Sequence, residues 1–201
     1  FYAHFDPARV AELFREMEFR TLIPRLPQGD GRAAAIPAEP APAALEQRFS
    51  VVRTESGLDT LASRIAKQKW FVLDTETTDR DVMSAGLVGI TIGLGGGEAF
   101  YVPVGHAPRL GDDGQIPLAA VLQRLGPLLE DPGVAVAGHN LKPDVIVLAN
   151  HGVRTQGLAF DTMIAAYLLG EGGGAGRPEE GALALGWLAS RRLGIEVPDR
   201  A

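Results

Sequence analysis

WFVLDTETTDRD, residues 70–81, joins a nearly continuous apolar run to an abrupt group of polar residues. An apolar run of this length is typical of a short β-strand that is covered on both faces of its sheet. Asp74 ends the run and Glu76 follows two residues later, so in an extended chain both side chains point to the same side. The stretch therefore predicts a buried strand with two carboxylates at its end.

The Asp74 and Glu76 pair has two interpretations. Two carboxylates on one side of a strand end repel each other unless a cation lies between them, and hard divalent cations prefer oxygen ligands. An acidic turn after a core strand contains the same residues, and chance produces an Asp-x-Glu triplet roughly once in 300 residues. From this segment alone, a metal site and an acidic turn are about equally supported.

The chain around this strand alternates short strands with amphipathic helices. Further strands are predicted at 49–54, 87–94, 98–104 and 134–138, and helices at 6–19, 58–67, 118–130, 141–150, 161–169 and 183–193. The glycines at 95–97 predict a hairpin turn, because a strand follows them where a dinucleotide-binding loop requires a helix. Three successive strands followed by alternating helix and strand predict an α/β fold with a mixed sheet.

HNLKPDVIVLANHG, residues 139–152, predicts a helix with a clear beginning and end. Asn140 is a candidate N-cap, Pro143 falls in the first turn where its missing N–H is tolerated, and Gly152 is a stop signal. The helix is expected to bury the apolar side chains of Val145, Ile146, Leu148 and Ala149.

Asp144 is the candidate third acid. It lies four residues after Asn140, so both are expected on one helix face near the positive end of the helix dipole, where phosphates are favoured. Asp144 is either a partner of that dipole or a metal ligand. Together with Asp74 and Glu76 it predicts a site of three carboxylates, the type that hydrolyses phosphodiesters with two metal ions.

The composition fits a globular domain, with 46% hydrophobic and 22% charged residues. The absence of cysteine excludes disulfides and thiolate metal sites, so any metal must bind oxygen or imidazole. Because no apolar run approaches about 18 residues and no signal-peptide pattern is present, we expect a cytoplasmic protein without a membrane partner. The net charge of −6 argues mildly against broad binding of duplex nucleic acid but allows a site that grips a few nucleotides.

Four stretches of the sequence, in order, resemble the proofreading domain of bacterial family A DNA polymerase I, a ribonuclease H-like exonuclease of the DEDD superfamily. They are FVLDTETTDRDVMSAGLVGITIG, AFYVPVGH, GHNLKPDVIVLANHGV and AFDTMIAAYLL. The segment HFDPARVAELFREMEFRTLIPRLP is similar to the tail of the preceding 5′ nuclease region. The resemblance implies such a tail at 1–27, a Pro/Ala/Gly-rich linker at 28–47 and a ribonuclease H-like exonuclease domain with a mixed sheet flanked by helices at 48–201.

The resemblance also implies a function, which is metal-dependent 3′→5′ proofreading of DNA with release of deoxynucleoside monophosphates. It implies Mg²⁺ or Mn²⁺ as the cofactor, bound by the catalytic residues Asp74, Glu76 and Asp144. A single-stranded or frayed DNA 3′ end is the implied substrate, and the candidate residues that contact it are Asn140, Thr75 and His139. The implied partners in a longer parent chain are 5′ nuclease and DNA-directed DNA polymerase domains.

Three features depart from the family pattern. Arg80 stands where the family often has leucine, and Pro143 replaces a commoner aromatic residue. The third family motif, a tyrosine four residues before a final aspartate on a late helix, is expected beyond this chain, because Tyr167 is followed by Glu171 at that spacing and Asp199 is preceded by Ile195. The two-metal site is therefore expected to be incomplete here, and the chain alone to have little exonuclease activity.

Two alternative functions remain at this stage. Besides a proofreading exonuclease, the chain could be an inactive exonuclease-fold spacer between 5′ nuclease and polymerase domains. It could also be a stand-alone DEDD-type ribonuclease. The retained acids favour an active site over a spacer, and the N-terminal segment at 1–27 disfavours the ribonuclease.

Overall fold

The structure is a computed structural model that describes residues 6–19, 23, 26, 47–107, 114–171, 181 and 183–195. Apart from Gln47, the predicted linker at 28–47 lies outside the described residues, as does most of the glycine-rich segment after Glu171. The boundaries of the three predicted segments therefore stay a prediction.

A six-stranded mixed β-sheet forms the centre of the fold. Its strands, in chain order, are β1 (Arg48–Val51), β2 (Trp70–Thr77), β3 (Leu87–Gly95), β4 (Glu98–Pro103), β5 (Ala135–Gly138) and β6 (Leu158–Asp161). The spatial order is β1-β4-β3-β2-β5-β6, with β3 antiparallel to both β2 and β4 and the other three pairs parallel. The predicted mixed sheet is confirmed, but β6 was missed because its four residues are too short to show a strand pattern.

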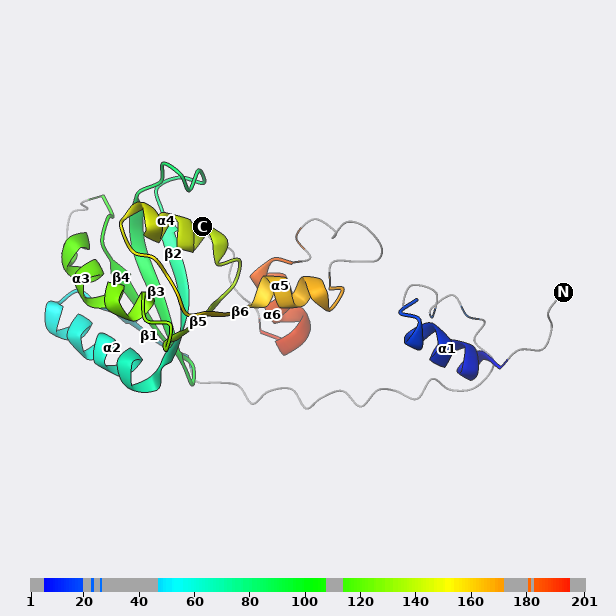
Figure 1. Ribbon diagram of the computed structural model, residues 1–201. Coiled ribbons are helices and arrows are strands. Elements are labelled where there is room, and N and C mark those ends of the chain that lie inside the picture. Colours follow the sequence, from blue (N-terminus) through cyan, green and yellow to red (C-terminus); the bar gives the residue numbers. More distant parts are fainter. Residues whose placement is uncertain are drawn as a thin grey trace.

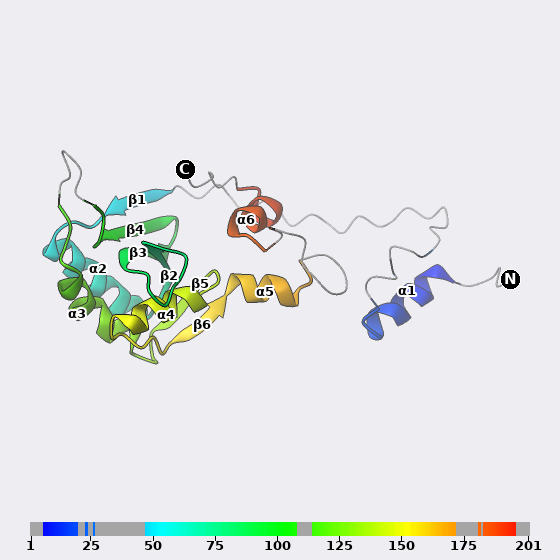
Figure 2. The same ribbon diagram turned by 90° about the horizontal axis from the view of Figure 1, so that it is seen from above.

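The described part of the chain also contains six helices. They are α1 (Pro7–Glu16), α2 (Glu55–Gln68), α3 (Leu118–Leu129), α4 (Lys142–Asn150), α5 (Thr162–Leu168) and α6 (Leu185–Leu193). Figures 1 and 2 show α2 and α3 beside the sheet, whereas α5 continues from the end of β6 and contacts α6. None of the helices in the described ranges is both long enough and apolar enough to cross a lipid bilayer.

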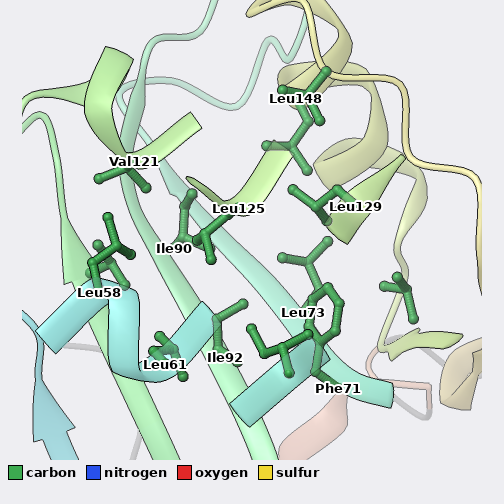
Figure 3. Close-up of a cluster of buried hydrophobic side chains, with 14 of the residues drawn as sticks. Leu58, Leu61, Phe71, Leu73, Ile90, Ile92, Val121, Leu125, Leu129 and Leu148 are labelled. Carbon is green, nitrogen blue, oxygen red and sulfur yellow. The ribbon is translucent and has the colours of Figure 1, made fainter. Parts of the chain in front are cut away.

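The hydrophobic core lies on one face of the sheet. Phe71 and Leu73 of β2 and Ile90 of β3 are at most 1% exposed. Figure 3 shows these side chains in one cluster with Leu58 of α2 and Leu125 of α3. Since full burial of one such side chain contributes about 1.5–3 kcal/mol, this cluster is the main stabilising feature of the domain.

The other side of β2 is not buried, and here the sequence prediction was wrong. Trp70 and Val72, which alternate with Phe71 and Leu73, are 39% and 40% exposed. The run of apolar residues predicted a strand covered on both faces, but α2, α3 and α4 all contribute to the core on the Phe71 side. We call the sheet side that carries Trp70 and Val72 the open face.

The turn between β3 and β4 confirms the predicted hairpin. Gly95, Gly96 and Gly97 have φ values of +82°, +59° and +80°. Three successive residues in this region are tolerated only where no Cβ is present, which explains the glycine run without any cofactor role.

The one-sided core gives a first prediction. Leu58→Ala should lower the free energy of unfolding by about 2–5 kcal/mol, because it leaves a cavity where Leu58 is fully buried. The matched control Leu158→Ala, at a position in β6 that is 49% exposed, should cost less than about 1 kcal/mol. Urea denaturation followed by circular dichroism measures both, and equal losses would contradict the assignment of Leu58 to the core.

Candidate active site

Asp74 and Glu76 lie in the second half of β2. Both are half-buried, and they pair with Thr91 and Gly89 of β3. Side chains alternate along a strand, so both carboxylates lie on the open face with Val72. The same-side arrangement that the sequence predicted is therefore present. The strand is irregular just after Glu76, where a register shift begins.

Asp144, which follows much later in the sequence, is held against the same strand by Thr75. Its Oδ1 accepts hydrogen bonds from the Thr75 backbone N–H at 2.8 Å and from the Thr75 Oγ1 hydroxyl at 2.6 Å. This contact is possible because β5 ends opposite Leu73, so α4 begins where a longer β5 would have paired with Thr75. The third acid therefore lies next to the residue that separates the first two.

Burial has the largest effect on the pKa of Asp144. The side chain is only 5% exposed, and loss of solvation raises its pKa, although the two hydrogen bonds from Thr75 act in the opposite direction. The negative charge of Asp161 raises the pKa of Asp144 further, and the net shift is upward. The ionised form is thus costly in the absence of a nearby positive charge, and a bound cation would reduce that cost.

The three acids offer the oxygen donors that hard divalent ions prefer. Among the residues that the structure describes, however, no three histidine, aspartate or glutamate side chains are grouped closely enough to hold a metal ion. The chemistry of the donors fits a divalent cation, and the metal-binding role of Asp74, Glu76 and Asp144 stays a prediction.

The turn that leads into α4 differs from the one expected. Asn140 is exposed with φ at +59°, and α4 begins at Lys142 with Leu141 in the N-cap position. The backbone N–H groups of Asn140 and Leu141 instead donate to the Asp161 carboxylate at 3.0 and 2.8 Å. An acceptor from a distant segment thus replaces the side-chain cap that the sequence assigned to Asn140.

The other predicted features of α4 are partly confirmed. Pro143 occupies the first turn, and Gly152, with φ at +86°, follows the end of the helix. The buried apolar face was only partly predicted, because Val147 and Leu148 are buried whereas Val145, Ile146 and Ala149 are not. The buried face of α4 is therefore narrower than its apolar composition indicates.

His139 lies in the same turn and is half-buried. Its Nδ1 is 2.9 Å from the Oγ1 hydroxyl of Thr162 at the start of α5. Arg80, the departure from the family pattern near the first motif, is exposed. Glu171, four residues after Tyr167, forms ion pairs with Arg191 and Arg192 of α6.

Tyr101 is a neighbour of the acids that the sequence analysis missed. Tyr101 is a residue of β4 and pairs with Thr91 of β3, and its phenol lies across Gly89, the residue of β3 that pairs with Glu76. Burial raises the pKa of Tyr101, and the charge of Glu76 adds to the increase. Only the register of three strands, which the sequence does not display, places this phenol beside Glu76.

His106 fixes the outer end of that phenol. The Tyr101 hydroxyl is 2.5 Å from His106 Nε2, and the two rings meet edge to face at 5.7 Å between centroids. The backbone of His106 is held by the Gln115 amide, which accepts from the His106 N–H at 2.7 Å and donates to its carbonyl at 2.8 Å. Tyr101 therefore has a defined position on the open face.

Comparison with known proteins identifies the family. The family model DNA_pol_A_exo1, described as 3′-5′ exonuclease, matches residues 49–197. The chain belongs to this 3′-5′ exonuclease family. The resemblance to the exonuclease domain of DNA polymerase I is thereby confirmed, and exonucleases of this DEDD type generally depend on divalent metal ions.

Two relatives illustrate the match. DNA polymerase I of Pseudomonas aeruginosa is 33% identical over 195 residues, which cover 95% of this chain and 21% of the relative. DNA polymerase I of Chloroflexus aurantiacus is 34% identical over 200 residues, which cover 83% of this chain and 20% of the relative. The chain spans about a fifth of the length of these curated relatives.

Solved structures confirm the predicted ribonuclease H-like fold. The catalytic core of RRP6 from Trypanosoma brucei aligns with a TM-score of 0.58 and 17% identity over 78% of this chain and 37% of the other. The POL domain of Pol1 from M. smegmatis aligns with a TM-score of 0.55 and 23% identity over 75% of this chain and 23% of the other. At these identities the likeness shows the exonuclease fold alone.

The close approach of Tyr101 to Gly89 gives a second prediction. A Cβ at position 89 would lie 2.0 Å from Tyr101 Oη and 2.3 Å from Cζ, so Gly89→Ala should cost about 1–3 kcal/mol of stability. In a Tyr101→Ala background the cost should fall below about 1 kcal/mol. Gly86→Ala is the control, because its Cβ would meet nothing closer than 3.5 Å. Urea denaturation of the four variants measures this coupling, which equal costs in both backgrounds would disprove.

The raised pKa of Asp144 gives a third prediction. An acid whose pKa is raised by folding contributes stability at low pH, and that contribution is lost as the pH rises through the folded-state pKa. Metal-free Asp144→Asn should therefore be more stable than wild type at pH 7 and lose this advantage near pH 3, since Asn retains an acceptor for Thr75. Urea denaturation in EDTA across this range measures the difference.

Asp131 supplies a control of opposite sign. A hydrogen bond from the Gly133 N–H and the ion pair with Lys69 lower the pKa of Asp131. Asp131→Asn should therefore reduce stability at pH 7, with a smaller effect at acid pH. A stability loss in metal-free Asp144→Asn at pH 7 would contradict the assigned cost of burying its charge.

Proposed function

We propose that this chain is the proofreading exonuclease domain of a DNA polymerase I and removes nucleotides from the 3′ end of DNA. The observation that carries the proposal is the pair of hydrogen bonds from Thr75 to Asp144. They bring the acid of the second family motif to the strand that carries Asp74 and Glu76. In a chain of this exonuclease family, that arrangement supports an active site better than a spacer.

The acids are proposed to hold Mg²⁺ or Mn²⁺. When bound, such cations supply positive charge for the scissile phosphate and for the attacking water. Asp74 and Glu76 present carboxylates on the open face, and Thr75, the residue between them in the sequence, holds Oδ1 of Asp144. The role of this chain is therefore to hold three negative groups in place before the cation and the DNA arrive.

The DNA 3′ end is proposed to approach the beginning of α4. Asn140 is exposed there and His139 is half-buried, so both side chains can reach a bound strand. The N–H and the hydroxyl of Thr75 both donate to Asp144, so the main proposed role of Thr75 is to orient that acid. A single-stranded or frayed end is the preferred substrate, because a paired end must first be opened at an energetic cost.

The parent protein is proposed to carry a 5′ nuclease region and a DNA-directed DNA polymerase domain, as the resemblance and the relatives' name support. After the second motif, no tyrosine of this sequence stands four residues before an aspartate, as the family's third motif requires. We therefore expect weak exonuclease activity from this chain alone, with deoxynucleoside monophosphates as the product of the parent protein.

Manganese titration tests the proposed site. Asp74→Ala and Asp144→Ala should each weaken Mn²⁺ binding by about tenfold or more, because each removes a ligand from a site that is already incomplete. Isothermal titration calorimetry of the 201-residue chain measures the affinity. The control is Asp131→Ala, which removes an acid at the opposite end of β5 and should leave the affinity unchanged.

The outcomes separate the candidate functions. An inactive spacer predicts that neither Asp74→Ala nor Asp144→Ala changes Mn²⁺ binding, which would overturn the proposal. A ribonuclease predicts faster shortening of a 3′-labelled RNA than of the matched single-stranded DNA in the presence of Mn²⁺. The proofreading function predicts a preference for the DNA and a further loss of activity in both variants.

A further inference from the structure

Asp161 occupies the end of β6, directly opposite Gly138 at the end of β5. It is the N-cap residue of α5, and its Oδ1 accepts hydrogen bonds from the N–H groups of Met163 at 2.9 Å and Ile164 at 3.3 Å. A helix N-cap of this kind is an ordinary structural role for aspartate. By itself it gives Asp161 no connection to the candidate site.

The same carboxylate also binds the turn that precedes α4. Oδ1 accepts from Asn140 N–H at 3.0 Å, and Oδ2 accepts from Leu141 N–H at 2.8 Å. Burial raises the pKa of Asp161, but its four backbone hydrogen bonds lower it by more, so the net shift is downward. One ionised side chain therefore joins the beginnings of two helices.

Thr162 strengthens this junction. Its hydroxyl donates to the carbonyl of Gly138 at 3.2 Å and lies 2.9 Å from His139 Nδ1. The consecutive residues Asp161 and Thr162 thus contact every residue from Gly138 to Leu141. The turn has no other side-chain cap, since Leu141 supplies none for α4.

The position of this turn determines the position of Asp144. Leu141 is the N-cap residue of α4, and Asp144 follows in its first turn, where it accepts both hydrogen bonds from Thr75. A rigid helix transmits any shift of its first residue to a side chain three positions later. Hydrogen-bond partners behind a metal ligand commonly orient that ligand and tune its affinity.

We infer that Asp161 is a positioning residue of the exonuclease site, whose carboxylate fixes the 139–141 turn and thereby sets Asp144 against β2. The inference rests on the proposed function and adds to it a residue that does not itself face the Asp74 and Glu76 pair. It differs from a simple α5 cap because it depends on the bonds that Asp161 accepts from Asn140 and Leu141.

Asp161→Asn separates the two roles. Asparagine is as good an N-cap as aspartate, so its Oδ1 preserves the bonds from Met163 and Ile164. Its amide nitrogen replaces Oδ2 and faces the Leu141 N–H, where two donors cannot bond. If Asp161 only caps α5, the substitution is harmless, whereas a positioning role requires a change at α4. Asp161→Ser, which keeps a short capping oxygen for α5 but loses the reach to α4, is a second variant with the same expectation.

The first readout needs no metal and no activity. In ¹H–¹⁵N NMR spectra of the ¹⁵N-labelled chain, Asp161→Asn should shift the amide signals of Leu141 and Thr75 and speed their hydrogen exchange about tenfold, while those of Met163 and Ile164 keep their protection. The Thr75 amide is decisive, because it reports the position of Asp144. An unchanged Thr75 signal in both Asp161 variants would overturn the inference.

The second readout is Mn²⁺ affinity by calorimetry. Asp161→Asn should bind Mn²⁺ about tenfold more weakly than wild type. Asp131→Asn is the matched control, since Asp131 also accepts a backbone N–H, that of Gly133 at 2.8 Å, but lies at the other end of β5. Wild-type affinity in both Asp161 variants would refute the positioning role. Equal Mn²⁺ affinities of wild type and Asp144→Ala would instead refute the proposed function. The NMR comparison would still decide the role of Asp161 in that case.

Discussion

The two hydrogen bonds from Thr75 to Asp144 are the interaction on which the candidate site depends. They are possible only because β5 ends opposite Leu73 and the chain turns at once into α4. A longer β5 would occupy the edge of β2 with backbone pairs and displace the acid. The short strand, the tight turn and the first turn of α4 therefore act together, and the first and second acidic segments meet without any direct contact between carboxylates being required.

One face of the sheet carries the hydrophobic core, and the other carries the acids Asp74 and Glu76. Phe71 and Leu73 bury their side chains against α2 and α3, which fixes β2 in the core, and the alternate residues then carry Asp74 and Glu76 on the open face. A strand that is firmly held on one side can present charged groups on the other without moving. Tyr101 joins the open face by the same alternation, from β4, which is two strands away from the β2 strand that holds Asp144.

Local patterns predicted most of the fold but not the contacts between segments. The positions of β1 to β5, the hairpin glycines and the same-side placement of Asp74 and Glu76 all follow from neighbouring residues. The capping of the α4 turn by Asp161 does not, because it requires the pairing of β6 with β5, and β6 is too short to be recognised. Tyr101 was missed for a related reason, since its approach to Glu76 depends on register through Gly89. The apolar run of β2 was wrongly assigned to a fully covered strand because hydrophobicity does not reveal what packs on it.

Asp161 and Asp144 show how burial and hydrogen bonding together determine the direction in which the pKa of an acid shifts. Asp161 accepts four backbone N–H groups, and these outweigh its burial, so its pKa is lowered and it stays ionised. Asp144 is nearly inaccessible, and burial outweighs the hydrogen bonds that it accepts, including the two from Thr75, so its pKa is raised. The protein thus compensates the charge of the aspartate that holds the turn and leaves that of Asp144 only partly compensated. A bound divalent cation would offset such a partly compensated negative charge, which links the raised pKa of Asp144 to its proposed function.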